Sequence, residues 1–292
     1  MELRHIRYFL AVVEERNFTR AAAKVGIGQS PLSQQIKDLE REVGASLFRR
    51  VPYGAELTIA GEAFLEVVRH FPGLADRAVH AAQRAARGEI GSLNVGFTAS
   101  SAFNAVVPGA IRSFRRAYPD VHLTLSEGNT TMLVDCLNEG TLDAAFLRPG
   151  AVGTDVFQLR LLSEEPMMVA LPTSHAAASR EEVDLADFAT DPLVLFPRSV
   201  GPAFYDTIIG AFRAVNVEPR MGQTAPQIAS VVNLVAAALG ISVVPASMAQ
   251  LSVAGVVFRP IRGEGPVARI ALATRKSDTG KIVRNFIARA MS

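Results

Sequence analysis

The stretch from Phe18 to Glu40 constrains the fold of this chain most strongly, because it predicts two short helices joined by a tight turn. Alanines at positions 21–23 give the first helix a small side, so a second helix can pass close to it. We expect Gly26 to end the first helix in a left-handed backbone conformation. Ser30 and Pro31 resemble an N-cap and a first-turn proline of the second helix. This arrangement is typical of a helix-turn-helix, which presents its second helix to the major groove of DNA.

The second helix of this motif is predicted to be amphipathic. Its apolar residues recur at helical spacing and share an inward face: Leu32, Ile36, Leu39 and Val43. Its opposite face offers side-chain donors and acceptors: Ser33, Gln34, Lys37 and Arg41. An ordinary surface helix would show the same periodicity. The coincidence of cap, turn glycine, alanine run and polar face favours the helix-turn-helix.

The segments on either side of the motif agree with it. Residues 2–16 carry one apolar stripe and predict a helix that braces the motif. Residues 47–58 resemble a two-stranded wing that turns at Pro52-Tyr53-Gly54. Arg49 and Arg50 begin this wing, where they are placed for phosphate contacts or for the minor groove. The alternative is that both are solvated surface arginines.

A long helical pattern follows the wing, from Thr58 to about Gly88. Thr58 is placed to cap its start, and Pro72-Gly73 in its middle predict a kink or a break. A stripe of this length usually packs against a partner helix, so we expect it to form a dimer. Packing of this helix against its own chain is the alternative.

The remaining residues alternate between strand and helix patterns, which predicts an α/β fold with a mostly parallel sheet. A second set of strands and helices interrupts the first, with crossovers near residues 164–168 and 265–269. Two lobes joined by two strands form a cleft, and small ligands bind at the carboxyl ends of such strands.

The predicted domains are therefore 1–58 for DNA binding, 59–90 for the linker helix and 91–292 for the two lobes. The first lobe comprises about 91–165 and 268–292, and the second comprises about 166–267.

Composition excludes several classes of function. Residues 1–58 hold nine Lys/Arg and seven Asp/Glu, so the formal net charge of +2 lies entirely there. Cys136 is the single cysteine, which excludes an internal disulfide and favours a buried apolar role over redox sensing. The five histidines are scattered, and no phosphate loop, Gly-x-Ser-x-Gly elbow or metal-ligand spacing occurs. We therefore expect no catalytic residues, no metal and no enzyme activity.

The N-terminus and the apolar runs bear on location and on a second hypothesis. The first residues form an amphipathic helix pattern instead of a secretory segment, and no apolar run reaches membrane-spanning length. A cytoplasmic protein without membrane contact is expected. A solute-binding module with a merely dimerising N-terminus is the competing hypothesis, which the lack of a secretory segment disfavours.

With these residues in view, the chain resembles the LysR-type transcriptional regulators over essentially its full length. The resemblance is carried by Phe18, Ala21, Ala22, Gln29, Ser30, Leu32, Ser33, Ile36, Leu39, Glu40, Gly44, Leu47, Phe48, Arg49 and Thr58. The second half is most similar to the subclass that responds to aromatic acids and muconate-type intermediates. That similarity lies in residues 93–97, 119–123, 140–148 and 240–247.

The resemblance implies a winged helix-turn-helix, a linker helix and a two-lobed effector domain like that of periplasmic binding proteins. It implies a dimer of dimers that binds an interrupted dyad in double-stranded DNA and acts with RNA polymerase at the promoter. By residue match, the DNA contacts would be Gln29, Ser30, Pro31, Ser33, Gln34 and Lys37, with Arg49 and Arg50 from the wing. Position 34 is commonly arginine in the family and is glutamine here.

The resemblance also implies a cleft for a small effector, expected to be a carboxylate, and no cofactor. The matching positions are Ser100, Ser101, Thr130, Arg148, Pro202 and Phe204, to which Arg198 is added as a possible second positive group. Hydroxyls and helix starts would hold the carboxylate, while Phe204 would form an apolar wall. Structural roles compete for the polar residues: helix capping for Ser100 or Thr130, an internal ion pair for Arg148 and plain surface exposure for Arg198.

Overall fold

The computed structural model describes residues 1–52, 54–150, 155–278 and 280–292. The chain divides into two compact units, Met1–Arg84 and Ala85–Ser292. In the described residues, no helix has both the length and the apolar character needed to cross a membrane.

Three helices form the body of the first unit: α1 (Leu3–Glu15), α2 (Phe18–Val25) and α3 (Gln29–Val43). Their apolar faces meet in one core that includes Phe9, Leu32 and Leu39, all with fully buried side chains. Phe9 also packs against the ring of Phe48, with 5.1 Å between the ring centroids. The predicted helix-turn-helix is therefore present, with the apolar residues of its second helix turned inward. Val43, at the C-terminal end of α3, is the exception and is exposed.

The turn between α2 and α3 confirms one expectation and corrects another. Gly26 has φ 76°, and its N–H donates to carbonyls of the last turn of α2. However, α3 begins at Gln29 with Gly28 as N-cap, so Ser30 is not the cap. Pro31 lies in the first helical turn, where its missing N–H costs no intrahelical hydrogen bond. The helix can therefore start before the serine.

The wing consists of β1 (Phe48–Val51) and β2 (Gly54–Leu57), paired antiparallel. Glu40 ties the wing to α3, because its Oε1 accepts hydrogen bonds from the backbone N–H groups of Leu47 and Phe48 at 2.7 and 3.1 Å. The expected turn includes Tyr53, which lies outside the described residues.

The linker pattern folds as two helices, α4 (Ile59–Val68) and α5 (Phe71–Ala86). Thr58 caps α4, since its Oγ1 accepts a hydrogen bond from Gly61 N at 3.0 Å. The break falls just before Pro72, which occupies the first turn of α5. The proline thus starts the second helix and does not kink a continuous one.

The second unit is built on a seven-stranded sheet with the order β10-β6-β11-β5-β3-β4, to which β9 adds by pairing with β6. Its strands are β3 (Gly91–Thr98), β4 (Val121–Gly128), β5 (Ala144–Leu147), β6 (Phe157–Pro172), β9 (Ser242–Pro245), β10 (Val256–Pro260) and β11 (Val267–Arg275). Among the described strand pairs of this sheet, only β3 with β4 and β3 with β5 are parallel. The prediction of a mostly parallel sheet was wrong, because β6 and β11 pair antiparallel with each other and with their neighbours.

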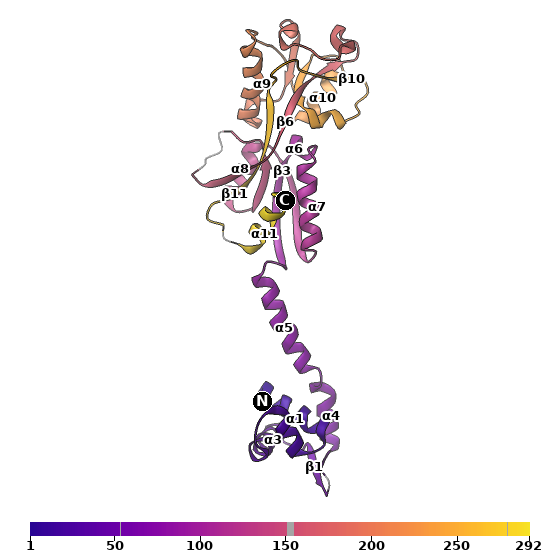
Figure 1. Cartoon of the computed structure of the whole chain (residues 1–292), viewed down its shortest axis with the longest axis vertical. Coiled ribbons are helices and arrows are strands. Elements are labelled where there is room, and N and C mark those ends of the chain that lie inside the picture. The colour runs from indigo at the N-terminus through magenta and orange to yellow at the C-terminus, as the bar shows by residue number, and fades with distance from the viewer. Residues whose placement is uncertain (53, 151–154, 279) are drawn as a thin grey trace. The chain divides into compact units, whose positions relative to one another are not determined.

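Strands β6 and β11 join the two lobes, and β6 runs through both of them (Figure 1). Within the β6–β11 pair, Glu165 lies opposite Ala268, and both belong to the segments predicted as crossovers. A separate parallel pair, β7 (Pro192–Leu195) with β8 (Arg220–Thr224), belongs to the second lobe. Strands β8 and β10 were not predicted, and β8 has every residue exposed, so it lacks the apolar pattern of a strand.

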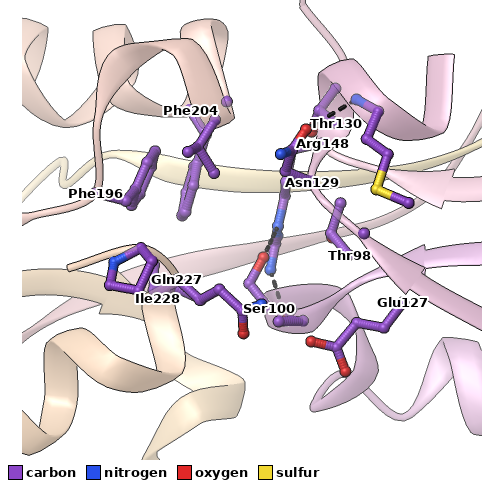
Figure 2. Close-up of a pocket in the computed structure, with 16 residues that line it drawn as sticks. Thr98, Ser100, Glu127, Asn129, Thr130, Arg148, Phe196, Phe204, Gln227 and Ile228 are labelled. Carbon is purple, nitrogen blue, oxygen red and sulfur yellow. Dashed lines mark hydrogen bonds between the residues drawn. The ribbon is translucent and has the colours of Figure 1, made fainter. Parts of the chain in front are cut away.

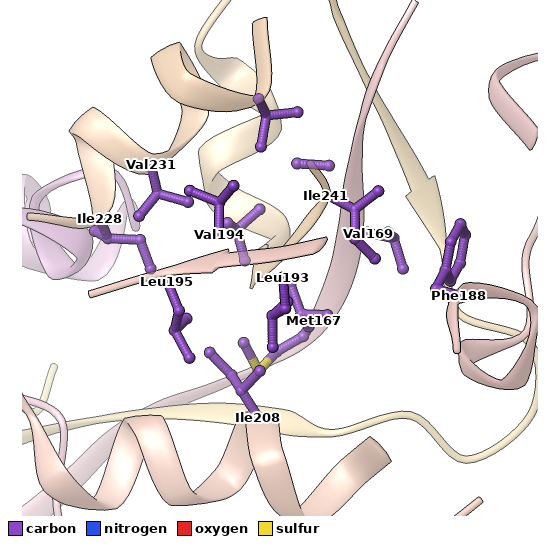
Figure 3. Close-up of a cluster of buried hydrophobic side chains, with 14 of the residues drawn as sticks. Met167, Val169, Phe188, Leu193, Val194, Leu195, Ile208, Ile228, Val231 and Ile241 are labelled. Atoms are coloured by element: carbon purple, nitrogen blue, oxygen red, sulfur yellow. The ribbon is translucent and has the colours of Figure 1, made fainter. Parts of the chain in front are cut away.

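Helices cover both lobes: α6 (Ala99–Ala102), α7 (Val106–Ala117), α8 (Thr130–Glu139), α9 (Pro202–Ala214), α10 (Ile228–Ala236) and α11 (Lys281–Ala290). Short 3-10 turns, including those at Arg198–Val200 and Ala246–Gln250, complete the second lobe. Each lobe has its own apolar core. In the second lobe Val169, Leu195 and Val231 are fully buried between β6, β7 and α10 (Figure 3). Because each lobe packs around its own core, a ligand site is expected in the space between the two lobes.

Candidate functional site

A cavity of about 240 Å³ lies between the two lobes of the second unit. It is lined from the first lobe by Thr98, Ala99, Ser100, Glu127, Gly128, Asn129, Thr130, Met132 and Arg148. The second lobe contributes Phe196, Val200, Gly201, Phe204, Pro226, Gln227 and Ile228. Figure 2 shows these two sets facing each other. The first set lies at the carboxyl ends of β3, β4 and β5, as expected for a ligand cleft in an α/β fold.

Several polar groups converge on the cavity from helix starts. Helix α8 begins at Thr130, and its N-cap Asn129 accepts a hydrogen bond from Met132 N at 2.8 Å. Helix α10 begins at Ile228, and the side chain of its N-cap, Gln227, makes no capping bond. Unpaired N–H groups give each helix start a partial positive charge. The two helix starts therefore favour a negatively charged group, while Glu127 in the same wall opposes one in its own vicinity.

Thr98 provides a polar atom that the protein leaves without a partner. The residue is 7% exposed, and its Oγ1 has no hydrogen-bond partner among the residues that the structure describes. A buried hydroxyl without a partner costs free energy.

Arg148 is buried beside the cavity, and its donors are used by the protein. Its Nε donates to Ser100 Oγ at 3.2 Å and its Nη2 to the carbonyl of Ser100 at 3.1 Å. Its Nη1 and Nη2 both lie 3.4 Å from Glu165 Oε1, and Nη1 also lies 3.4 Å from the carbonyl of Arg269. Glu165 in turn accepts a hydrogen bond from Ser247 N at 2.8 Å. Arg148 therefore links the first lobe to both crossover strands.

Burial lowers the pKa of Arg148 to about 10, against the opposing effect of the Glu165 carboxylate. The guanidinium consequently remains positively charged at neutral pH. It also lies over the ring of Phe204, with 5.1 Å between Cζ and the ring centroid. Phe204 stacks on Phe196 with 5.6 Å between centroids and 14° between planes. These two rings form an apolar wall on the second lobe, across the cavity from the start of α8 (Figure 2).

The cavity gathers four of the predicted effector residues: Ser100, Thr130, Arg148 and Phe204. Pro202 lines a smaller neighbouring cavity of about 130 Å³ that shares Thr130, Arg148 and Phe204 with the first.

Two predicted residues lie outside both cavities. Ser101 is fully buried, and its hydroxyl donates to the carbonyl of Thr98 at 2.8 Å. Arg198 is exposed and forms two hydrogen bonds with Asp206, which hold the pKa of that carboxyl below its usual value.

Several lining residues were not predicted from the sequence, among them Thr98, Glu127, Asn129, Phe196 and Gln227. Thr98 ends β3, and Glu127 and Asn129 lie at the end of β4, so the rule that ligands bind at strand carboxyl ends points to all three. Gln227 follows β8. Every residue of this strand is exposed, so the sequence shows no apolar pattern that would predict it.

The candidate DNA-contacting residues lie on one exposed face of α3 and on the wing. Gln29, Ser30, Pro31, Gln34 and Lys37 are exposed, and Ser33 is half-buried among them. In the wing, Arg49 is bonded to Glu56 at 2.8 and 3.0 Å, which reduces its availability. Arg50 lies over the ring of Phe18, with 6.0 Å between its Cζ and the centroid, and is exposed. Of the two arginines, Arg50 is the better placed for a phosphate.

Comparison with known proteins decides the family. The protein-family model described as "Bacterial regulatory helix-turn-helix protein, lysR family" matches residues 3–62. A second family model, "LysR substrate binding domain", matches residues 86–291. The chain belongs to the LysR family. It is therefore a DNA-binding transcriptional regulator, since this family consists of regulators and not of enzymes.

Individual relatives match the chain along its length. The transcriptional regulator BudR of Raoultella terrigena is 39% identical, over 98% of this chain and 99% of that protein. AlsR of Bacillus subtilis is 33% identical, over 98% of this chain and 94% of its own length. The crystal structure of the LysR regulator CbnR superposes with a TM-score of 0.86 at 30% identity, over 99% of this chain and all of that one.

A second similar structure is full-length CbnR in complex with its target DNA, with a TM-score of 0.85 at 30% identity, covering 99% of this chain and 98% of that one. LysR regulators bind DNA and oligomerise. The similarity to the two CbnR structures covers both the DNA-binding and the effector-binding part of this chain, so the fold of both parts is that of a LysR regulator. The aromatic-acid subclass stays a prediction.

Proposed function

We propose that this LysR regulator controls promoters in response to a small carboxylate bound between its two lobes. The observation that carries the proposal is a cavity between the lobes whose wall includes the starts of α8 and α10. A carboxylate oxygen accepts from hydroxyls and from backbone N–H groups, and negative charge is favoured at helix starts.

The cavity also favours a particular kind of carboxylate. Its volume is below the usual 300–1,000 Å³ of sites for drug-sized ligands, so the effector is small. The stacked rings of Phe196 and Phe204 suit a flat apolar body such as an aromatic ring or a diene. Glu127 lies at the cavity wall, and a second carboxylate on the ligand would be repelled by it. A benzoate-like monoanion therefore fits better than a muconate-like dianion.

In this proposal Arg148 acts on the ligand through its positive charge and does not form a bidentate ion pair with it. Because its donors already serve Ser100, Glu165 and a backbone carbonyl, a bidentate pair with the ligand would break existing bonds. Its positive charge still offsets part of the cost of placing a carboxylate in the cavity.

In this proposal the exposed face of α3 enters the major groove and Arg50 contacts the phosphate backbone. Apolar residues on α5, including Leu74 and Val79, are exposed and would pack in a dimer. Two such dimers form a tetramer on an interrupted dyad and act with RNA polymerase. Binding of the effector shifts the lobes only to the extent that it binds one arrangement more tightly than the other.

The test is a thermal-shift titration of the full-length protein with benzoate, cis,cis-muconate and the neutral analogue benzyl alcohol. At one hundred times its dissociation constant, a ligand adds about 2.7 kcal/mol to the free energy of unfolding. We expect the largest shift with benzoate and none with benzyl alcohol. Thr130→Val should reduce the shift, while Arg198→Ala, outside the cavity, should not.

Equal shifts for benzoate and benzyl alcohol would contradict a carboxylate site, and a larger shift with muconate would contradict the role given to Glu127. The DNA half of the proposal is tested separately, by the affinity for the upstream region of its own promoter. That affinity should exceed the affinity for random duplex and fall with added salt.

A further inference from the structure

The exposed face of α3 carries two glutamines whose amides are hydrogen-bonded along the helix. Gln29 Nε2 lies 2.9 Å from Ser33 Oγ, and Gln34 Nε2 donates to Asp38 Oδ1 at 3.0 Å. A hydroxyl both donates and accepts, so Ser33 permits either orientation of the Gln29 amide. An ionised carboxylate only accepts, so Asp38 holds the NH₂ group of Gln34 toward itself. Only the Gln34 amide is fixed in orientation.

The fixed orientation determines what Gln34 presents to the groove. One of its N–H groups is used by Asp38, which leaves Oε1 as an acceptor and the second N–H as a donor. Adenine offers the complement in the major groove, an N7 acceptor beside an N6 donor. Guanine offers two acceptors there, which would leave Oε1 of Gln34 without a donor. Cytosine offers only its N4 donor, which would leave the second N–H of Gln34 unused.

The charge of Asp38 would oppose the approach of DNA if it stood alone. Arg41 Nη1 lies 3.1 Å from the same Oδ1 atom that accepts from Gln34. The arginine side chain is 73% exposed and the aspartate 32%, so the pair lies at the helix surface. Arg41 thus offsets the carboxylate while the carboxylate orients Gln34.

From this arrangement we infer that Gln34 reads an adenine in each half of the DNA site and that Asp38 is its positioning residue. The inference rests on the proposed contact between α3 and the major groove. It assigns a base preference to a position where an arginine would instead select guanine.

The experiment is a selection of bound sequences from a library of random-sequence duplexes with the full-length protein. Single base-pair changes in the enriched site are then measured by competition binding. The wild type should require an A·T pair at one position of each half-site, and Gln34→Ala should abolish that requirement. The discrimination lost there should be about 5- to 140-fold, with the other positions unchanged. Gln34→Arg should exchange the adenine for guanine at the same position.

Asp38→Asn tests the positioning role, because an amide can donate or accept and no longer fixes Gln34. It should weaken discrimination at that one position only. Arg50→Ala is the matched control and should weaken binding to every sequence alike. The inference is overturned if Gln34→Ala keeps every base preference, or if the affected position is G·C in the wild type. If the wild type enriches no sequence, the proposed DNA contact itself fails, which is a distinguishable result.

Discussion

Two arginine–carboxylate pairs in different units of the protein show how burial changes the role of the same chemistry. Arg41 and Asp38 meet at the surface of α3, with 73% and 32% of their side chains exposed. Arg148 and Glu165 meet between the lobes, with 4% and 9% exposed. Water screens the first pair, while the second has exchanged water for protein donors and acceptors.

Because the two pairs differ in exposure, they have different roles. An exposed pair contributes about 0–1 kcal/mol to stability, so the value of Asp38 lies in orienting Gln34. A buried pair is weak evidence of net stability, but loss of one member leaves an uncompensated charge. Arg148 therefore holds together the two strands that join the lobes beside the cavity. The ligand must bind without displacing it from Glu165.

The largest effect is expected from breaking the buried pair. Arg148→Met leaves Glu165 charged and without its ion partner, and should lower the free energy of unfolding by about 3–5 kcal/mol. Urea denaturation followed by circular dichroism measures this, because the chain has no tryptophan for fluorescence. The double variant Arg148→Met with Glu165→Gln should recover much of the loss. A single-variant loss below about 1 kcal/mol would show that the pair is not effectively buried.

A second prediction concerns the close packing of α4 against the start of the wing in the DNA-binding unit. A Cβ at Gly61 would lie 2.0 Å from the carbonyl oxygen of Leu47, so Gly61→Ala must push α4 from the wing. We expect a loss of about 1–3 kcal/mol in the free energy of unfolding. Gly73→Ala is the control, since a Cβ there meets nothing within 4 Å, and it should stabilise α5 by about 0.5–1 kcal/mol. Similar losses from both variants would refute the close approach.

A third prediction concerns the contact between the lobes at the cavity rim. Thr131 Oγ1 donates to the carbonyl of Ser199 at 3.0 Å, from the first lobe to the second. Thr131→Val should weaken benzoate binding by about 2- to 10-fold, because a bond of this kind contributes about 0.5–1.5 kcal/mol. Isothermal titration calorimetry measures the change. Thr141→Val removes a similar exposed hydroxyl bond within the first lobe and should leave binding unaltered.

The smallest effect is expected from breaking the exposed pair. Asp38→Ala should change the free energy of unfolding by no more than about 0.5 kcal/mol, because water solvates Arg41 in its place. Thermal denaturation checks this. A loss as large as that of Arg148→Met would erase the distinction between the two pairs.

Much of the DNA-binding unit was predictable because its signals are local. Helical periodicity placed Leu32, Ile36 and Leu39 in the core, and Gly26 adopts the left-handed conformation expected of it. The start of α3 was misplaced because Pro31 fits more than one position in a first turn. The strand β8 was missed because none of its residues is buried.

The sequence by itself determined the helix-turn-helix, the wing and the alternation of strands and helices, since each depends on neighbours a few residues apart. Only the tertiary structure decided the antiparallel course of β6 and β11, the partners of Arg148 and the exclusion of Arg198 from the cavity. The ion pair between Arg148 and Glu165 joins residues that the fold brings together while both lose their water. Periodicity reports which face of an element is buried, but it carries no information on which charge will be buried beside it.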